Sequence, residues 1–117
     1  MSDYTIYHNP RCSKSRQTLA LLEEHGITPE IVLYLEQAPS VETLQSLLHK
    51  LGVDARALLR KGEDDYKLNN LADLSLDDKD LLAAMHQHPK LIERPIVVRG
   101  SRAVLGRPPE NVLELIA

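Results

Sequence analysis

Short apolar segments near both ends of the chain flank a long middle stretch in which apolar residues recur with helical spacing. Near the N-terminus, residues 5–7 predict a strand that ends at Asn9-Pro10, and residues 12–25 predict a helix. Residues 30–34 form a nearly continuous apolar run, which is typical of a buried parallel strand. This order predicts a right-handed βαβ unit.

The middle stretch, residues 40–88, contains no strand pattern. Ser40 is the expected N-cap of its first helix, and Asp54 is expected to cap a short second one. Ser75-Leu76-Asp77-Asp78 resembles a capping box with Asp in place of Glu, and the helix after it is expected to end at His88-Pro89. The stretch is therefore expected to be entirely helical.

The C-terminal segment predicts a hairpin followed by a helix. Residues 95–98 and 103–105 are apolar strands around Gly100-Ser101, and Pro108-Pro109 precedes the last helix. Together with the βαβ unit, this hairpin predicts an α/β fold with a four-stranded mixed sheet. We expect a single domain over residues 1–117, with a helical insertion at approximately 40–88.

Composition narrows the possible functions and surroundings of the protein. The 117 residues include no Phe and no Trp, and the net charge of −3 gives no overall attraction to nucleic acid or to an anionic membrane. No apolar run is long enough to span a bilayer, no signal-peptide pattern is present, and the one cysteine allows no internal disulfide. We therefore expect a cytoplasmic protein without a metal ion, which partners neither nucleic acid nor membrane.

The cysteine, Cys12, stands where the first strand turns into the first helix. The unpaired N–H groups and the positive end of the dipole at a helix start favour a thiolate and can hold an anion. Arg11, Lys14 and Arg16 add positive charges nearby. Most lone cysteines are buried and inert, but this position favours a reactive thiol of lowered pKa.

Two nearby polar residues could tune this thiol. Ser15, one turn along the helix, could donate a hydrogen bond to the thiolate, or it could be an ordinary polar residue of a first turn. His8 could stabilise the thiolate when protonated, move a proton when neutral, or be a satisfied histidine at a strand end. The sequence leaves these alternatives open.

Three arginines lie at junctions between predicted elements. Arg60 is in a turn after a helix, Arg94 precedes Pro95 at a strand start, and Arg107 precedes the last helix. Guanidinium groups bind tetrahedral oxyanions through paired hydrogen bonds, although a single arginine is more often a solvated surface charge. Only convergence of the three would make an oxyanion site.

Four segments together resemble the ArsC family, the glutaredoxin-linked arsenate reductases, and most of all its short YfgD-type branch. They are His8-Asn9-Pro10-Arg11-Cys12-Ser13-Lys14-Ser15-Arg16, Leu59-Arg60-Lys61-Gly62-Glu63, Glu93-Arg94-Pro95-Ile96-Val97 and Gly106-Arg107-Pro108-Pro109-Glu110. The resemblance covers essentially the whole chain.

This resemblance implies a thioredoxin-like fold and a cytoplasmic enzyme of arsenic detoxification. It implies that Cys12 is the nucleophile, tuned by His8 and Ser15. It also implies that Arg60, Arg94 and Arg107 hold arsenate, or a similar oxyanion, beside a cis Pro95. Because the chain has no second cysteine, the reducing thiols must be external, with glutathione as co-substrate, glutaredoxin as partner and no bound cofactor. We expect a monomer.

Two alternative functions remain at this stage. A Spx-like regulator that binds RNA polymerase would have a similar fold, but such proteins typically carry Cys-x-x-Cys, whereas this chain has Cys12-Ser13-Lys14-Ser15. A general glutathione-dependent thiol oxidoreductase, which acts on mixed disulfides of proteins, is the other.

Overall fold

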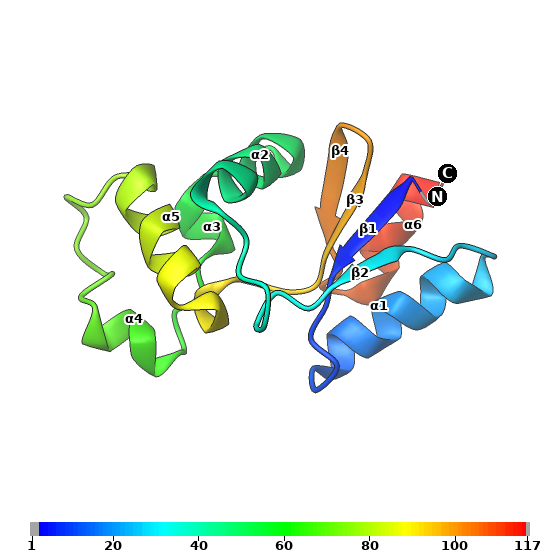
Figure 1. Ribbon diagram of the computed structural model, residues 1–117, viewed down its shortest axis with the longest axis horizontal. Coiled ribbons are helices and arrows are strands. Elements are labelled where there is room, and N and C mark those ends of the chain that lie inside the picture. The colour runs from blue at the N-terminus through cyan, green and yellow to red at the C-terminus, as the bar shows by residue number, and fades with distance from the viewer. Residues whose placement is uncertain (1–2, 117) are drawn as a thin grey trace. The chain divides into compact units, whose positions relative to one another are not determined.

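The computed structural model describes residues 3–116, which form two compact units. One unit comprises residues 3–37 and 94–116 and contains a four-stranded sheet. The other comprises residues 38–93 and contains helices, with one isolated bridge between Leu59 and Ile92. Figure 1 shows the elements of each unit, and the predicted helical block falls within the second. No helix in the described range is both long enough and apolar enough to cross a membrane.

The sheet unit has the predicted α/β architecture. Its elements are β1 (Tyr4–Tyr7), α1 (Ser13–Glu24), β2 (Glu30–Val32), β3 (Ile96–Arg99), β4 (Arg102–Leu105), the 3-10 helix η2 (Pro109–Val112) and α6 (Leu113–Ile116). The strand order is β2-β1-β3-β4, with β1 parallel to β2 and with β3 antiparallel to β1 and β4. The sheet is therefore mixed, as the sequence predicted.

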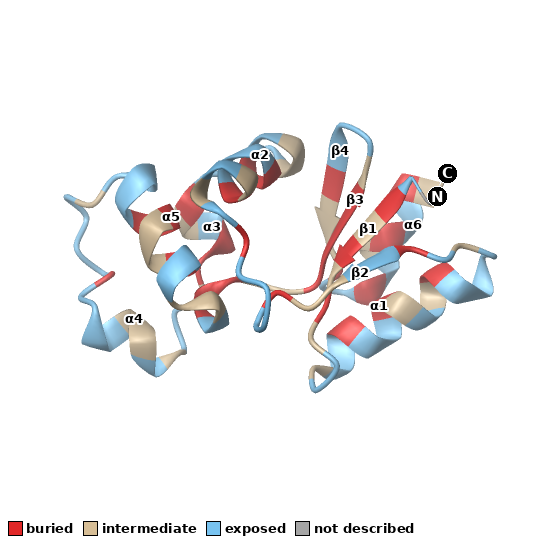
Figure 2. Ribbon diagram, in the orientation of Figure 1, coloured by how far each residue is buried: buried red, intermediate tan, exposed pale blue. Residues whose placement is uncertain are grey.

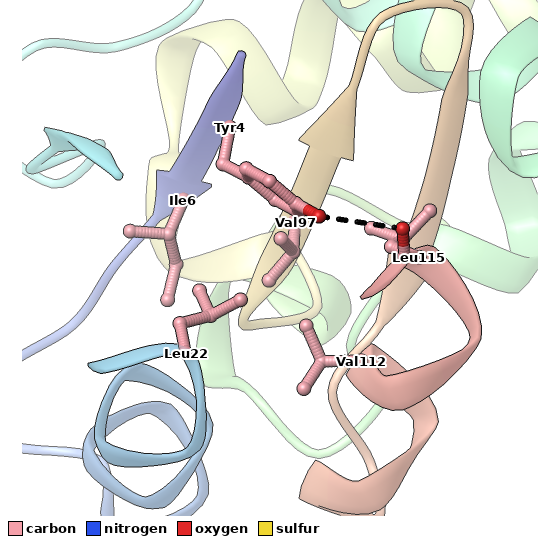
Figure 3. Close-up of a cluster of buried hydrophobic side chains, with 6 residues drawn as sticks. All are labelled: Tyr4, Ile6, Leu22, Val97, Val112 and Leu115. Atoms are coloured by element: carbon pink, nitrogen blue, oxygen red, sulfur yellow. Dashed lines mark hydrogen bonds between the residues drawn. The ribbon is translucent and has the colours of Figure 1, made fainter. Parts of the chain in front are cut away.

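Helices α1, η2 and α6 contribute to one hydrophobic core with the sheet. Ile6 and Val97, which are register partners on β1 and β3, are fully buried. Figure 3 shows their side chains gathered with Leu22 of α1, Val112 of η2 and Leu115 of α6. Burying aliphatic side chains of this size contributes about 1.5–3 kcal/mol each. This core anchors the N-terminal helix whose first turn carries Cys12.

The prediction of a parallel strand within residues 30–34 is confirmed, but the expectation that this strand is buried is wrong. β2 has only three residues and lies at the edge of the sheet, beside β1 alone. Ile31 is 47% exposed, and Figure 2 shows an exposed surface along much of β2. An apolar run indicates a strand, but the number of its neighbours depends on the sheet order, which the run does not encode.

Strand register brings four chain segments to one edge of the sheet. Tyr7, near the end of β1, pairs with Val32 of β2 and with Ile96 of β3, and Ile96 pairs with Leu105 of β4. Because β2 runs parallel to β1 and β3 runs antiparallel to β1 and β4, three strands end where β3 begins. The segments at this edge are residues 8–12, 33–36, 94–95 and 106–107.

The helical unit confirms two predicted caps. Its elements are α2 (Val41–Leu51), α3 (Ala55–Leu58), α4 (Asp64–Leu68), α5 (Asp78–Gln87) and the 3-10 helix η1 (Pro89–Leu91). The Ser40 side chain accepts a hydrogen bond from the Thr43 N–H, and the Asp54 carboxylate accepts one from the Ala57 N–H. Both residues satisfy a donor that the helix start leaves unpaired.

The predicted capping box is wrong by two residues. The N-cap of α5 is Asp77, whose side chain accepts from the Asp80 N–H, while the Asp80 carboxylate accepts from the Asp77 N–H. The Ser75 hydroxyl instead donates to Asp73 Oδ1, at 2.7 Å. Several adjacent Ser and Asp residues can each serve as a cap, so the sequence alone did not identify the one used. The short helix α4 was also not predicted.

Candidate functional site

Cys12 lies at the N-cap of α1, at the sheet edge where the four segments meet. Its own N–H donates to the Asn9 carbonyl at 3.0 Å, which closes the loop between β1 and α1. The groups that act on its sulfur are the backbone N–H groups of Ser15 and Lys14, at the start of the helix, and the Arg94 side chain. The sulfur is thus held at a helix start, as the sequence predicted, and is only half-buried.

These contacts favour the thiolate. Burial raises the pKa of the Cys12 thiol, but hydrogen bonds from the Ser15 backbone and the Arg94 side chain, the charge of Arg94 and the Lys14 backbone together lower it below its ordinary value. The charge that acts on the sulfur therefore comes from Arg94, 82 positions along the chain, and not from the basic residues beside Cys12 in sequence. The direction of the shift is that of a nucleophilic cysteine.

We expect this lowered pKa to be visible in the pH dependence of Cys12 alkylation. Iodoacetamide reacts with the thiolate, so the rate falls as pH falls through the thiol pKa. The midpoint for this protein should lie below the value of about 8.5 for a free thiol. Free glutathione titrated alongside is the control, and added sulfate should slow alkylation by occupying the same donors. A midpoint at or above that of the control would contradict the geometry.

His8 and Ser15 form a buried pair behind the thiol. His8 Nδ1 and Ser15 Oγ are 2.6 Å apart, and Ser15 Oγ also accepts from the Asn9 N–H at 3.0 Å. Burial and the charge of Arg16 lower the pKa of His8. The imidazole is therefore neutral near pH 7, which favours proton transfer among the alternatives that the sequence left open. The Ser15 hydroxyl contacts His8, and it is the Ser15 backbone that contributes to the lowered pKa of Cys12.

Arg94 and Arg107 are brought together by the sheet. Arg94 directly precedes β3, and Arg107 follows β4, whose end is paired with the start of β3. Arg107 Nη1 lies 3.4 Å from the Arg94 carbonyl, and the Arg94 side chain reaches the Cys12 sulfur. Arg94 thus acts on the thiol, and Arg107 contacts the backbone of Arg94.

Both arginines precede a cis peptide bond. The Arg94–Pro95 bond is cis, in agreement with the expectation drawn from the resemblance. The Arg107–Pro108 bond is also cis, which the sequence analysis did not foresee. The X–Pro sequence allows this geometry but does not require it, because the trans form is the more common in folded proteins.

Arg60, the third predicted arginine, lies in the helical unit. It follows α3, its N–H donates to the Leu91 carbonyl at 2.7 Å, and its Nε lies 3.9 Å from Glu93 Oε1. Its Nη1 is buried and has no hydrogen-bond partner among the described residues. A cation with an unengaged buried donor is suited to an anionic ligand.

Two residues that support the site were missed by the sequence analysis. Gly106 and Thr18 pack against the segment that carries Pro95: the Gly106 N–H donates to the Pro95 carbonyl at 2.9 Å, and Thr18 Oγ1 donates to the Lys14 and Gly106 carbonyls. Thr18 lies one turn after Ser15 on α1 and is fully buried. Its spacing from Ser15 was the available signal, but a buried threonine cannot be told from an exposed one by spacing alone.

Gly106 is expected to tolerate no side chain. A Cβ at this position would lie 2.8 Å from Pro95 Cγ and 3.0 Å from Thr18 Cγ2, and even closer to Thr18 Oγ1. We expect Gly106→Ala to lower the free energy of unfolding by about 1–3 kcal/mol, as other overpacking substitutions do. The measurement is urea unfolding. The matched control is Gly62→Ala, because nothing lies within 4 Å of a Cβ there. Equal stability of the two variants would contradict the close packing at Gly106.

The assembled residues can bind and attack a small oxyanion. A thiolate, backbone N–H groups at a helix start and two guanidinium groups together supply a nucleophile and donors for developing negative charge. Within residues 3–116 no group of three or more His, Cys, Asp or Glu side chains is placed to hold a metal ion. The sequence-based expectation about metals stays a prediction.

Known proteins match this chain over nearly its whole length. The model of the ArsC family matches residues 7–115. The uncharacterized protein YfgD of Escherichia coli K12 is 58% identical over 112 residues, which cover 95% of this chain and 94% of YfgD. An arsenate reductase of Haemophilus influenzae is 54% identical over 112 residues, covering 95% of this chain and 97% of that protein. The resemblance found in the sequence is therefore confirmed.

A solved structure shows the same fold. The arsenate reductase from Vibrio cholerae superposes with a TM-score of 0.93 at 58% identity, and the match covers 95% of each chain. The four-stranded thioredoxin-like architecture that the sequence predicted is therefore confirmed as well.

Proposed function

This chain belongs to the ArsC family, and on that premise we propose that it reduces arsenate to arsenite through Cys12, with glutathione and glutaredoxin as external thiols. The observation that carries the proposal is the lowered pKa of the single cysteine, Cys12, which lies at a helix start under the influence of the Arg94 guanidinium. Relatives about half identical to this chain are named arsenate reductases, which supports the substrate.

The first step is attack of the Cys12 thiolate on arsenic. A bond forms between sulfur and arsenic, one hydroxyl of arsenate takes up the proton that the Cys12 thiol has lost and leaves as water, and arsenic remains in the +5 state. Arg94 and Arg107 neutralise the charge on the arsenate oxygens, and the Ser15 and Lys14 N–H groups orient the sulfur. The family resemblance in sequence is the basis for proposing Arg60 as a further arsenate-binding residue.

The second step transfers two electrons to arsenic. Glutathione thiolate attacks the Cys12 sulfur, so that a disulfide forms and the sulfur–arsenic bond breaks. The electron pair of that bond stays on arsenic, which becomes arsenic(III) and leaves as arsenite. In this proposal His8 accepts a proton when the attacking thiol ionises, a role that its lowered pKa supports.

The third step restores the enzyme. A glutaredoxin thiolate attacks the glutathione sulfur of the mixed disulfide and releases the Cys12 thiolate. An external reductant is needed because Cys12 is the single cysteine in the sequence. The scheme fits a reducing compartment, so we propose that the protein works in the cytoplasm.

Intact-mass spectrometry tests the scheme directly. With arsenate and glutathione but no glutaredoxin, we expect one glutathione to accumulate on the protein, at Cys12, and glutaredoxin should remove it. Leaving out arsenate is the control and should leave Cys12 free. Equal glutathionylation with and without arsenate would contradict the proposal. Rapid turnover of a glutathionylated peptide without arsenate would instead favour a general thiol oxidoreductase.

A further inference from the structure

A cavity of about 290 Å³ lies at the same sheet edge as Cys12. Its lining comes from two segments, the loop between β1 and α1 and the turn that follows β2. The lining residues are His8, Asn9, Pro10, Arg11, Leu33, Leu35 and Glu36. The volume is near the lower limit of small-molecule sites, so it suits one or two residues of a peptide-like ligand. The arsenate-binding arginines do not line it, and the mechanism above assigns it no role.

The cavity presents two opposite charges that do not neutralise each other. Arg11 and Glu36 both line it, and neither side chain forms an ion pair within residues 3–116. The position of Glu36 is defined by a turn, in which the Glu36 and Gln37 N–H groups donate to the Leu33 carbonyl at 2.9 and 2.8 Å. Such a pair of charges can bind a ligand that carries an ammonium and a carboxylate close together.

The remaining lining suits an aliphatic chain. Leu33 and Leu35 contribute apolar surface, and Leu35 is 41% exposed although it borders the cavity. Covering such side chains with methylene groups contributes roughly 25 cal/mol per Å² of apolar surface buried. His8 also lines the cavity, and its Nδ1 is occupied by Ser15. The cavity therefore borders the residues that surround the reactive sulfur.

We propose that this cavity binds the γ-glutamyl end of glutathione, with Glu36 on its ammonium group and Arg11 on its α-carboxylate. The γ-glutamyl group carries both charges on one carbon, followed by two methylene groups that fit against Leu33 and Leu35. The loop that lines the cavity leads directly into Cys12, so the cysteinyl part of the ligand lies toward the sulfur. This assignment rests on the proposed function, because it locates the thiol donor of that reaction.

The test uses a ligand that cannot exchange disulfides. S-methylglutathione is titrated into the full chain in the absence of arsenate, and binding is followed by amide NMR shifts. We expect the largest shifts at Asn9, Arg11, Leu33, Leu35 and Glu36. Shifts confined to other parts of the chain would overturn the assignment.

Acetylation of the ligand amine isolates the contact with Glu36. N-acetyl-S-methylglutathione lacks the ammonium, so it should bind the parent protein about 1.5- to five-fold more weakly, the range of exposed ion pairs. The Glu36→Gln variant should bind S-methylglutathione more weakly than the parent protein by a similar factor. It should bind the acetylated and unacetylated ligands with equal affinity. Arg11→Gln should weaken both ligands. Glu30→Gln, which removes an exposed carboxylate of β2 outside the cavity, is the matched control.

The outcomes separate this proposal from the proposed function. Equal affinity of both ligands for the parent protein would overturn the role of Glu36, and an unchanged affinity in Arg11→Gln would overturn that of Arg11. The titration contains no arsenate, so it tests the cavity separately from the reaction. If the protein bound S-methylglutathione at the cavity but did not reduce arsenate, only the proposed function would be contradicted. Arg11 and Glu36 are exposed, so these variants are expected to fold.

Discussion

Cys12→Ser is expected to abolish arsenate reduction, with kcat/KM lowered by at least about 10³-fold. An alcohol at this position stays protonated at neutral pH and cannot form the disulfide that releases arsenite. The half-buried position of Cys12 and its backbone contacts accept oxygen in place of sulfur, so we expect the fold to be retained. The measurement is arsenite production with glutathione and glutaredoxin present.

Two further observations make this result decisive. The variant should still bind arsenate or sulfate, because Arg94 and the helix-start N–H groups remain, and calorimetry would show this. Ser13→Ala changes an exposed neighbour of Cys12 at the start of α1 and is expected to keep full activity. Undiminished arsenate reduction by Cys12→Ser would rule out the whole scheme.

Arg94→Ala is expected to lower kcat/KM for arsenate by roughly 10- to 100-fold. The Arg94 side chain donates to the Cys12 sulfur, and a hydrogen bond to a charged group contributes about 1.5–3 kcal/mol. The same change removes a cause that lowers the Cys12 pKa, so that pKa rises. Because the thiolate is the reactive form, the acidic limb of the rate profile should move to higher pH. Steady-state kinetics across pH measures both effects.

Two further arginine variants serve as comparisons for Arg94→Ala. Arg94→Lys keeps a positive charge but loses the planar pair of donors. Compared with Arg94→Ala, it should therefore recover much of the lowered Cys12 pKa but less of the arsenate affinity. Arg102→Ala, at the start of β4, removes a contact with the Glu114 carbonyl and should leave catalysis unchanged. Arg94→Ala with an unaltered pH profile would show that Arg94 does not act on the sulfur.

The local sequence pattern was enough to identify all four strands, most of the helices and the candidate thiol. Residues 5–7, 95–98 and 103–105 predicted strands that the structure contains with shifts of about one residue, because alternation and flanking turn residues are encoded in adjacent positions. The position of Cys12 between a strand and a helix could be predicted for the same reason. The influence of the helix-start N–H groups on the pKa of its thiol follows directly from that position.

Properties that depend on which segments become neighbours required the tertiary structure. The exposed edge position of β2, the choice of Asp77 as a cap and the packing of Gly106 against Thr18 have no signature in adjacent residues. The positive charge that lowers the pKa of Cys12 is the clearest case. The sequence offered three nearby cations, but the contact comes from Arg94, which β3 delivers because it runs antiparallel to β1. Sequence proximity limits what can interact locally, whereas strand register decides which distant side chains meet.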